Sequence, residues 1–451
     1  MSIRHALTPA VLTAAAVVLA ACGGGNGAEP ANSSESAAAL GPDRWMEAVY
    51  ANHPDTPLGQ VIIPGTHDSG SYGINVNAPC PIVPASGTNV AIDALGASNP
   101  CAAAGMYRAQ DQNLAAQLQD GIRYLDLRVS VPRTDTVTSA QAASADPAQV
   151  PFVLEHEFVS TPLKGALDEV LTFAKAHPKE QVILDFQHID LAKDADTTYY
   201  YNALQSLLKS YAPAGASPVC DLSWNADKLQ LTPAKLSGVT LGQAWDAGAN
   251  LVVLVPNGTL SADSCYYERN SAIMSQWPNT EDPATSVAYN QKELVERQQR
   301  LAASPQQCSN EGKDAKQGDN WCGFFVSQMQ LTFQPATFVG CIEDTKAECS
   351  LYAYSEKVNN TVANQVQDWR IAQALPVNIV IVDYFNNSDP SYTRSLIGIN
   401  QELAAGKGAS ADPGATALPS PSGVATATSS GSATPTAGSA SPTSGSAAPS
   451  G

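Results

Sequence analysis

IIPGTHDSG, at residues 62–70, is a short apolar run that ends in a Pro-Gly turn and a polar, glycine-rich loop. The apolar part predicts a buried strand, and the loop presents His67 and Asp68 directly after it. A histidine in that place can exchange a proton near neutral pH, and the glycines let a ligand approach the backbone. A buried histidine with a purely structural role is the alternative interpretation of this stretch taken alone.

Polar residues follow other apolar runs in the same way. Alternation along one of these runs places Asp126 and Arg128 on the same face of a strand, together with Tyr124. A further run, 251–255, is wholly apolar. The runs that end in polar residues are 123–129 with Asp126 and Arg128, 152–154 with His156, 181–186 with Gln187 and His188, and 377–382 with Asp383.

Segments with helical spacing of apolar residues lie between these runs, at 112–118, 163–176, 198–208 and 395–405. Strands that alternate with helices predict parallel β/α units and an α/β fold. Short apolar strands buried on both faces fit a barrel interior or a central sheet. In a TIM-type barrel the active site lies at the carboxyl ends of the strands, where the polar candidates fall here.

The N-terminus predicts a signal peptide over residues 1–21. A short basic region precedes an apolar core at 11–19, which is too short to span a bilayer as a helix. Residues 19–22 resemble the bacterial lipobox, which implies cleavage before Cys22 and lipidation of that residue. The alternative is ordinary signal cleavage that leaves Cys22 free or in a disulfide. We therefore expect an exported protein, lipid-anchored to the bacterial cell membrane or cell surface.

Composition divides the rest of the chain into three parts. Residues 22–40 are mostly small and polar, as in a flexible tether. Residues 406–451 are rich in Ser, Pro, Ala, Thr and Gly and cannot bury enough apolar surface to fold. They are typical of a disordered spacer or an O-glycosylated stalk. Residues 41–405 contain no further break in composition, so we expect one monomeric domain with long insertions.

The formal net charge of −18 excludes nucleic acid as a natural partner. It also disfavours strong attraction to an anionic membrane. A lipid substrate would therefore be reached through the anchor, or through local basic and apolar patches.

Eight cysteines remain when Cys22 is set aside, and an even number in an exported chain predicts disulfides. Eight cysteines allow 105 connectivities, so the sequence does not fix the pairs. No C-x-x-C pair and no nearby histidine suggests zinc. Pairing neighbours in sequence is the economical hypothesis: Cys80–Cys101, Cys220–Cys265, Cys308–Cys322 and Cys341–Cys349.

Several of these segments together resemble the bacterial phosphatidylinositol-specific phospholipase C family of the X-domain type. They are IIPGTHDSG at 62–70, QDQNLAAQLQDGIRYLDLRV at 110–129, FVLEHEF at 152–158, AHPKEQVILDF at 176–186 and NIVIVDYF at 378–385. The resemblance covers residues 55–205 well, 375–401 moderately and 206–375 only loosely. It implies an irregular TIM-type barrel, a single domain with disulfide-pinned loop insertions.

The resemblance also implies catalytic roles. His67 resembles the general base that takes a proton from the inositol 2-hydroxyl, with Asp383 orienting its ring. His156 aligns with the general acid that protonates the departing diacylglycerol oxygen. Arg128 would stabilise charge on the phosphoryl oxygens, and Asp68 would position Arg128 or assist proton transfer. Asp383 could instead cap the loop that follows it.

The sequence favours chemistry without a metal or another cofactor. Metal-dependent relatives carry Glu-x-Asp where this chain has Asp126-x-Arg128. A guanidinium supplies positive charge and planar donors to a phosphate, while the loss of one acid leaves calcium short of ligands. Asp126 itself is either a structural ion-pair partner of Arg128 or a catalytic residue.

Two departures from the family bear on the substrate. Enzymes that cleave phosphatidylinositol often carry a lysine where this chain has Gln187-His188, which weakens the case for phosphatidylinositol itself. Gln187 and His188 are candidates for substrate binding, and the alternative for His188 is a structural or exposed side chain. The long loop with Cys80 and Cys101 is expected to reshape the mouth of the site. Trp277 lies in another expected rim loop, where it would contact lipid or sugar, or simply pack.

Three functions compete at this point. The first is a phosphodiesterase that acts on a membrane inositol phospholipid and gives diacylglycerol and a cyclic inositol phosphate. The second is a glycerophosphodiesterase-like enzyme that uses a metal. The third is a non-catalytic surface lipoprotein that binds lipid or sugar. Such a protein would be expected to have lost one of the catalytic residues, whereas this chain retains all of them.

Lipidation of Cys22 leads to a direct prediction. Intact-mass measurement of the mature protein should find an N-terminal Cys22 carrying acyl chains, and Cys22→Ser should release the protein from the membrane fraction. An unmodified Cys22 thiol or cleavage at another residue would contradict the lipoprotein assignment.

Overall fold

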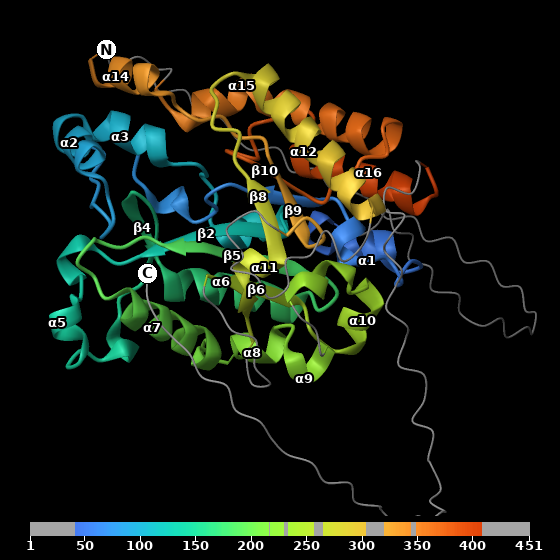
Figure 1. Cartoon of the computed structure of the whole chain (residues 1–451), viewed down its shortest axis with the longest axis horizontal. Helices are drawn as coiled ribbons and strands as arrows, with labels where there is room; N and C mark the ends of the chain where they lie inside the picture. Colours follow the sequence, from blue (N-terminus) through green and yellow to red (C-terminus); the bar gives the residue numbers. More distant parts are fainter. Residues whose placement is uncertain are drawn as a thin grey trace, which may run out of the picture. The chain divides into compact units, whose positions relative to one another are not determined.

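The computed structural model describes residues 41–215, 217–229, 233–256, 265–303, 320–343 and 349–407. Within these residues eight strands form one parallel sheet: β1 (Ile63–Thr66), β2 (Tyr124–Ser130), β5 (Val182–Ile189), β6 (Leu251–Val255), β7 (Tyr267–Glu268), β8 (Ile273–Gln276), β9 (Phe324–Gln328) and β10 (Ile379–Val382). Their order in the sheet is β7-β6-β5-β2-β1-β10-β9-β8, and every pairing on this path is parallel (Figure 1).

The two ends of this sheet are brought together by a single short helix. β7 and β8 lie at opposite ends of the strand order, yet only α11 (Arg269–Ala272) separates them in the chain. From α11 the Arg269 guanidinium crosses the interior and donates to both carboxylate oxygens of Asp185 in β5, at 2.6 and 2.9 Å. The sheet is therefore curled into an irregular barrel that α11 closes, which confirms the predicted fold class.

Strand alternation divides the core into two layers. Side chains of one parity fill the barrel interior, such as Ile63, Tyr124, Ile183, Phe324 and Ile381. Side chains of the other parity face outward and pack against helices, as the alternation of a strand buried on both faces requires. The helices that contribute buried residues to this outer layer include α4 (Leu114–Gln119), α6 (Leu163–Ala176), α7 (Thr197–Ser210), α12 (Pro283–Ala303), α15 (Leu351–Gln367) and α16 (Tyr392–Ala404).

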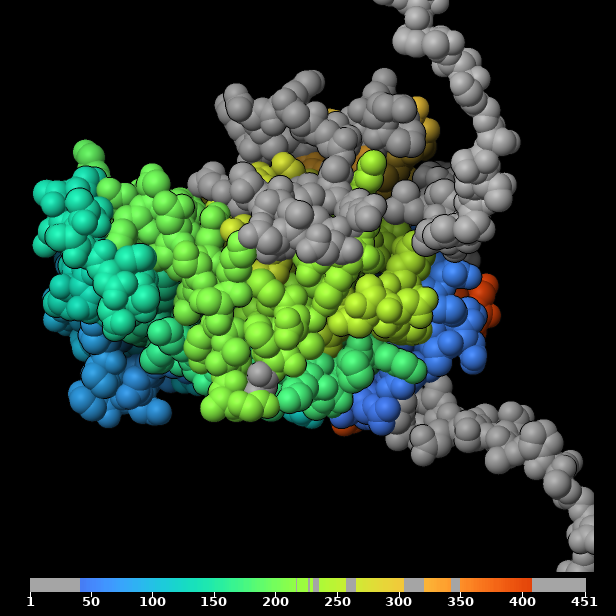
Figure 2. Space-filling model, turned by 90° about the horizontal axis from the view of Figure 1, so that it is seen from below, coloured from blue at the N-terminus to red at the C-terminus, as the bar shows by residue number. Residues whose placement is uncertain are grey.

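The predicted helices near residues 112–118, 163–176, 198–208 and 395–405 correspond to α4, α6, α7 and α16 and are confirmed. Figure 2 shows part of the outer surface, where α7 lies in green beside α5 (Ser139–Ala142) in teal. Further helices cross the carboxyl end of the barrel or extend from it, and they are α2 (Val90–Ser98), α3 (Pro100–Tyr107) and α14 (Pro335–Glu343).

Gly65 explains why the stretch at 62–70 carries a glycine inside a strand. A Cβ atom at this position would lie 2.8 Å from Cδ1 of Tyr124 and 2.9 Å from Cγ2 of Ile381. Both distances are shorter than side chains tolerate, so the interior at this level has room only for hydrogen.

Two expectations about strands were wrong in detail. The run at 152–154 is not a barrel strand, because β3 (Val153–His156) forms an antiparallel hairpin with β4 (Phe158–Pro162) and pairs antiparallel with β2. β5 also continues through Gln187 and His188 instead of ending before them. A bulge in the β2–β5 ladder at Leu127 and Arg128 allows this longer pairing.

Three of the expected disulfides are confirmed: Cys80–Cys101, Cys220–Cys265 and Cys341–Cys349. The partner expected for Cys322, Cys308, lies outside the described residues, as do Cys22, the predicted signal peptide, the tether and the tail. In the described ranges no helix has the length and apolar character that crossing a bilayer demands.

Candidate active site

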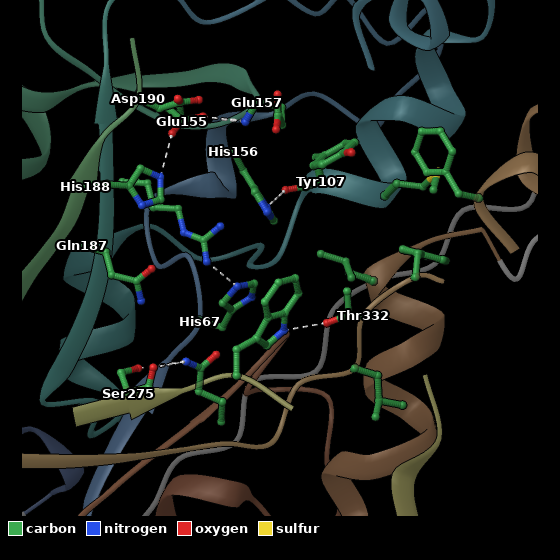
Figure 3. A pocket seen from close by; sticks show the side chains of 18 residues that line it. His67, Tyr107, Glu155, His156, Glu157, Gln187, His188, Asp190, Ser275 and Thr332 are labelled. Carbon is green, nitrogen blue, oxygen red and sulfur yellow. Dashed lines mark hydrogen bonds and ion pairs between the residues drawn. The ribbon is translucent and has the colours of Figure 1, made fainter. Parts of the chain in front are cut away.

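A cavity of about 440 Å³ opens at the carboxyl ends of the barrel strands (Figure 3). Its base carries His67, from the loop after β1, and Arg128, from β2, while His156 enters from the β3–β4 hairpin. The lining also includes Met106, Tyr107, Glu155, Glu157, Gln187, His188, Asp190, Ser275, Trp277, Gln328, Leu331, Thr332, Phe333, Phe338 and Leu351.

His67 lies between the carboxylate of Asp383 and the guanidinium of Arg128. Its Nδ1 lies 2.7 Å from Oδ1 of Asp383, and its Nε2 lies 2.7 Å from Nη2 of Arg128. Because a guanidinium can only donate, Nε2 must accept, and Nδ1–H then donates to Asp383. The ring is therefore neutral, with its basic nitrogen directed toward the cavity.

Arg128 lies beside two carboxylates. Its Nε is 3.6 Å from Oδ2 of Asp68, and its Nη2 is 3.5 Å from Oδ2 of Asp126. The same oxygen of Asp126 accepts a hydrogen bond from the backbone N–H of Asp68 at 3.1 Å. Asp126 thus fixes both the guanidinium and the loop after β1, and it stays outside the cavity lining. This geometry favours a positioning role over direct catalysis.

His156 contacts Tyr107, Asp68 and His67. Its Nδ1 donates to the carbonyl oxygen of Tyr107 at 2.7 Å and lies 3.1 Å from Oδ2 of Asp68. Its ring stands edge-on to that of His67, with 5.6 Å between the ring centroids. Nε2 of His156 is therefore the nitrogen left to exchange a proton with a ligand in the cavity.

Burial and the charge of Arg128 shift the pKa values of the ionisable side chains at the base of the cavity. Burial lowers the pKa of His156 well below its ordinary value, and the positive charge of Arg128 lowers it further. Burial raises the pKa of Asp68 well above its ordinary value, and Arg128 only partly opposes this. Burial alone would also raise the pKa of Asp126, but Arg128 reverses the effect and lowers it. Arg128 and Asp126 are therefore favoured in their charged forms, whereas burial disfavours charge on His156 and Asp68.

A second group of acids lines the wall of the cavity. Glu155 is only 2% exposed, and burial together with the neighbouring Asp190 raises its pKa to about 8. Burial also raises the pKa of Glu157 and of Asp190. Nε2 of His188 lies 3.8 Å from Oε1 of Glu155. These groups offer hydrogen-bond partners to a polyol.

The rim of the cavity is apolar. The Trp277 side chain is 51% exposed, and its Nε1 donates to Oγ1 of Thr332 at 2.9 Å. Beside it lie Phe333 and, from α14, Phe338. The cavity thus joins a polar base to an apolar mouth, as a ligand with a polar head and an apolar tail requires.

The structure gathers all the candidates for catalysis named from the sequence around one cavity: His67, Asp68, Arg128, His156 and Asp383. The candidates for substrate binding, Gln187, His188 and Trp277, line the same cavity. Sequence reasoning missed the acids Glu155, Glu157 and Asp190. The two glutamates flank His156 in the sequence, and that spacing was the available signal.

The described side chains of the site do not form a ligand set for a metal ion. Throughout the part of the chain that the structure describes, no group of three or more His, Cys, Asp or Glu side chains is arranged to hold a metal ion. Arg128 occupies the position between Asp68 and Asp126 where such an ion would need oxygen ligands.

Comparison with known proteins shows what this chain is similar to. No protein-family model matches the chain. It is 23% identical over 365 residues to PI-PLC X domain-containing protein 3 of Bos taurus, a match that covers 80% of this chain and 95% of the bovine one. It is 29% identical over 160 residues to the variant-surface-glycoprotein phospholipase C of Trypanosoma cruzi, covering 34% of this chain and 39% of that protein. The chain is therefore similar to PI-PLC X domain-containing proteins over most of its length.

Among solved structures, this chain is similar to the phosphatidylinositol-specific phospholipase C of Listeria monocytogenes. The sequence identity is 18%, the TM-score is 0.46, and the match covers 80% of this chain and 99% of the other.

The raised pKa of Glu155 predicts an unusual pH dependence of stability. The folded protein keeps this carboxyl protonated up to about pH 8, whereas the unfolded chain ionises it above about 4.5. Stability should therefore fall as the pH rises between these values. Glu155→Gln removes that loss, so urea unfolding should find the variant more stable than wild type at pH 8 but not at pH 4.5. An equal difference at both pH values would contradict the assignment.

Proposed function

We infer that this protein is a phospholipase C-type phosphodiesterase that cleaves phosphatidylinositol or a related inositol phospholipid. The observation that carries this proposal is the placement of His67, His156 and Arg128 together in one cavity, with 5.6 Å between the two imidazole centroids and with Arg128 hydrogen-bonded to His67. Two imidazoles beside a guanidinium match what an intramolecular attack on a phosphodiester needs, namely a base, an acid and a phosphate ligand.

His67 would act as the base. The inositol 2-hydroxyl loses its proton to Nε2 as its oxygen attacks phosphorus, and Asp383 stabilises the imidazolium that forms. Arg128 donates to that same Nε2 in the structure, so the phosphate must draw the guanidinium away before the base is free. Substrate binding and base activation are coupled through one side chain.

His156 would act as the acid. As the bond from phosphorus to the diacylglycerol oxygen breaks, Nε2 of His156 donates a proton to that oxygen. The products are diacylglycerol and a cyclic inositol phosphate. The Asp68 carboxyl lies 3.1 Å from Nδ1 of His156. It would favour the protonated form of His156 when the negative phosphate enters. The two buried groups therefore share the proton as one unit.

Arg128 would replace a metal ion. Its planar donors can bind two non-bridging phosphoryl oxygens, and Asp68 and Asp126 hold it in place. This is the basis on which we assign metal-independent catalysis with no cofactor.

The rest of the cavity suits an inositol phospholipid. Glu155, Asp190 and Gln187 line its polar wall and can accept hydrogen bonds from ring hydroxyls. The apolar rim around Trp277 can receive the glycerol and upper acyl carbons. The names of the relatives, PI-PLC X domain-containing protein and variant-surface-glycoprotein phospholipase C, accord with such a substrate. An anchor at Cys22 would keep the cavity within reach of membrane lipid.

Replacing His67 and His156 one at a time should distinguish the base from the acid. His67→Ala and His156→Ala should each lower turnover by about 10²–10⁴-fold without unfolding the protein. A substrate whose leaving group needs no proton, such as a nitrophenyl ester of inositol phosphate, should restore activity to His156→Ala but not to His67→Ala. Full activity on natural lipid in either folded variant would contradict the two-histidine mechanism.

Arg128 distinguishes this function from the glycerophosphodiesterase-like alternative. Activity should survive EDTA, and it should fall steeply in Arg128→Lys, because a point-charge ammonium cannot reproduce two parallel hydrogen bonds. Phosphorus NMR of vesicle-bound substrate gives both the rate and the cyclic product. Activity that is lost in EDTA and regained with calcium would favour the metal-dependent alternative.

A further inference from the structure

We propose that Gln110 is a positioning residue that sets the His67–Asp383 contact by joining the ends of β1 and β10. It lies in the loop between α3 and α4, is fully buried, and does not line the cavity. The proposal rests on the function inferred above and concerns what holds its base in place.

The side chain of Gln110 bridges the two strands at the point where they deliver the catalytic pair. Its Nε2 donates to the carbonyl oxygen of His67 at 3.0 Å and to that of Val382 at 2.9 Å. Val382 is the residue before Asp383, and its carbonyl also accepts from the backbone N–H of His67 at 3.1 Å. A primary amide has two donors in a fixed geometry, so one side chain fixes both strand ends together.

Hydrogen bonds of the main chain at Ala109 and Gln110 hold this connection between the strand ends in place. Oγ of Ser71 accepts from the N–H groups of Ala109 and Gln110, at 2.9 and 3.2 Å, and donates to the carbonyl oxygen of Asp68. The carbonyl of Ala109 accepts from the N–H of Tyr384 at 2.8 Å. The loop that carries Gln110 is therefore tied to both catalytic loops through its main chain, and these bonds do not depend on the Gln110 side chain.

Both catalytic loops need such a restraint. Asp68 and Tyr384, the residues directly after His67 and Asp383, have φ angles of 41°. This left-handed conformation costs free energy in residues other than glycine and persists only where surrounding contacts enforce it. Without the Gln110 amide, the carbonyls just before both turns lose a donor, and the imidazole and carboxylate are free to drift apart.

The same two strands provide a matched control at their other ends. Asn378, directly before β10, is also fully buried, and its Nδ2 donates to the carbonyl oxygens of Leu58 and Val61 at 3.1 and 2.9 Å. Its Oδ1 accepts from the N–H of Phe325 at 3.3 Å. It joins the amino ends of β1 and β10 as Gln110 joins their carboxyl ends, far from the cavity.

The experiment compares Gln110→Met with Asn378→Leu, two replacements of an amide by an apolar side chain of similar size. Both should lower the melting temperature. Gln110→Met alone should lower kcat, by about 10–100-fold, with little change in KM, because misplaced groups slow the chemical step without weakening substrate binding. The proton NMR signal of His67 Nδ1–H, hydrogen-bonded to Asp383, should shift or broaden in Gln110→Met and stay unchanged in Asn378→Leu.

Wild-type kcat and an unmoved Nδ1–H signal in Gln110→Met would overturn the proposal, as would an equal loss of kcat in Asn378→Leu. Should Gln110→Met not fold, Gln110→Glu keeps the shape but cannot donate to two carbonyls, and the same outcomes apply to it. Absence of phosphodiesterase activity in wild type would refute the proposed function instead, and the NMR comparison would still decide the role of Gln110.

Discussion

The parallel pairing of β1 with β10 is the constraint on which the site depends. Residues 63–66 pair with residues 379–382, so the two strands that carry His67 and Asp383 are adjacent although 316 positions separate the two residues. The ladder places both side chains at the same level of the barrel, where a hydrogen bond of 2.7 Å can form. Closing so long a loop is entropically costly, and the burial of the whole barrel core must offset that cost. The catalytic contact is thus a product of the completed fold.

Within that frame, Arg128 organises the charges. At 3.5 Å and an effective dielectric constant of about 20, one carboxylate attracts a guanidinium by roughly 4–5 kcal/mol. Ionising further carboxyls in this buried place costs free energy, which is why burial raises the pKa values of Asp68 and Glu155. Under the proposed function, a phosphodiester monoanion would meet a guanidinium that nearby anions do not fully neutralise.

The sequence predicted what local patterns encode. Short apolar runs and the polar residues after them gave the parallel barrel, and a family resemblance attached roles to His67, Arg128 and His156. The antiparallel course of β3 was missed because a short apolar run does not reveal the direction of its neighbour in the sheet. The amide of Gln110 and the rim residue Phe338 were missed for another reason. Gln110 contacts Val382, and Phe338 lines the same cavity as Trp277, and in both cases the two residues are distant in sequence, so only tertiary packing brings them together.

The polar base of the cavity and its apolar rim come from two different kinds of structural element. The reacting groups come from strand ends and from a hairpin whose backbones are held in register by ladders, which gives them precise positions. The apolar rim comes from the segments after β8 and β9 and from α14, whose side chains do not take part in the ladder. Replacing a rim residue therefore leaves the His67–Asp383 geometry intact, whereas displacing either strand end changes it. On this scaffold the rim can vary while the polar base of the cavity keeps its geometry, because different elements carry the two parts.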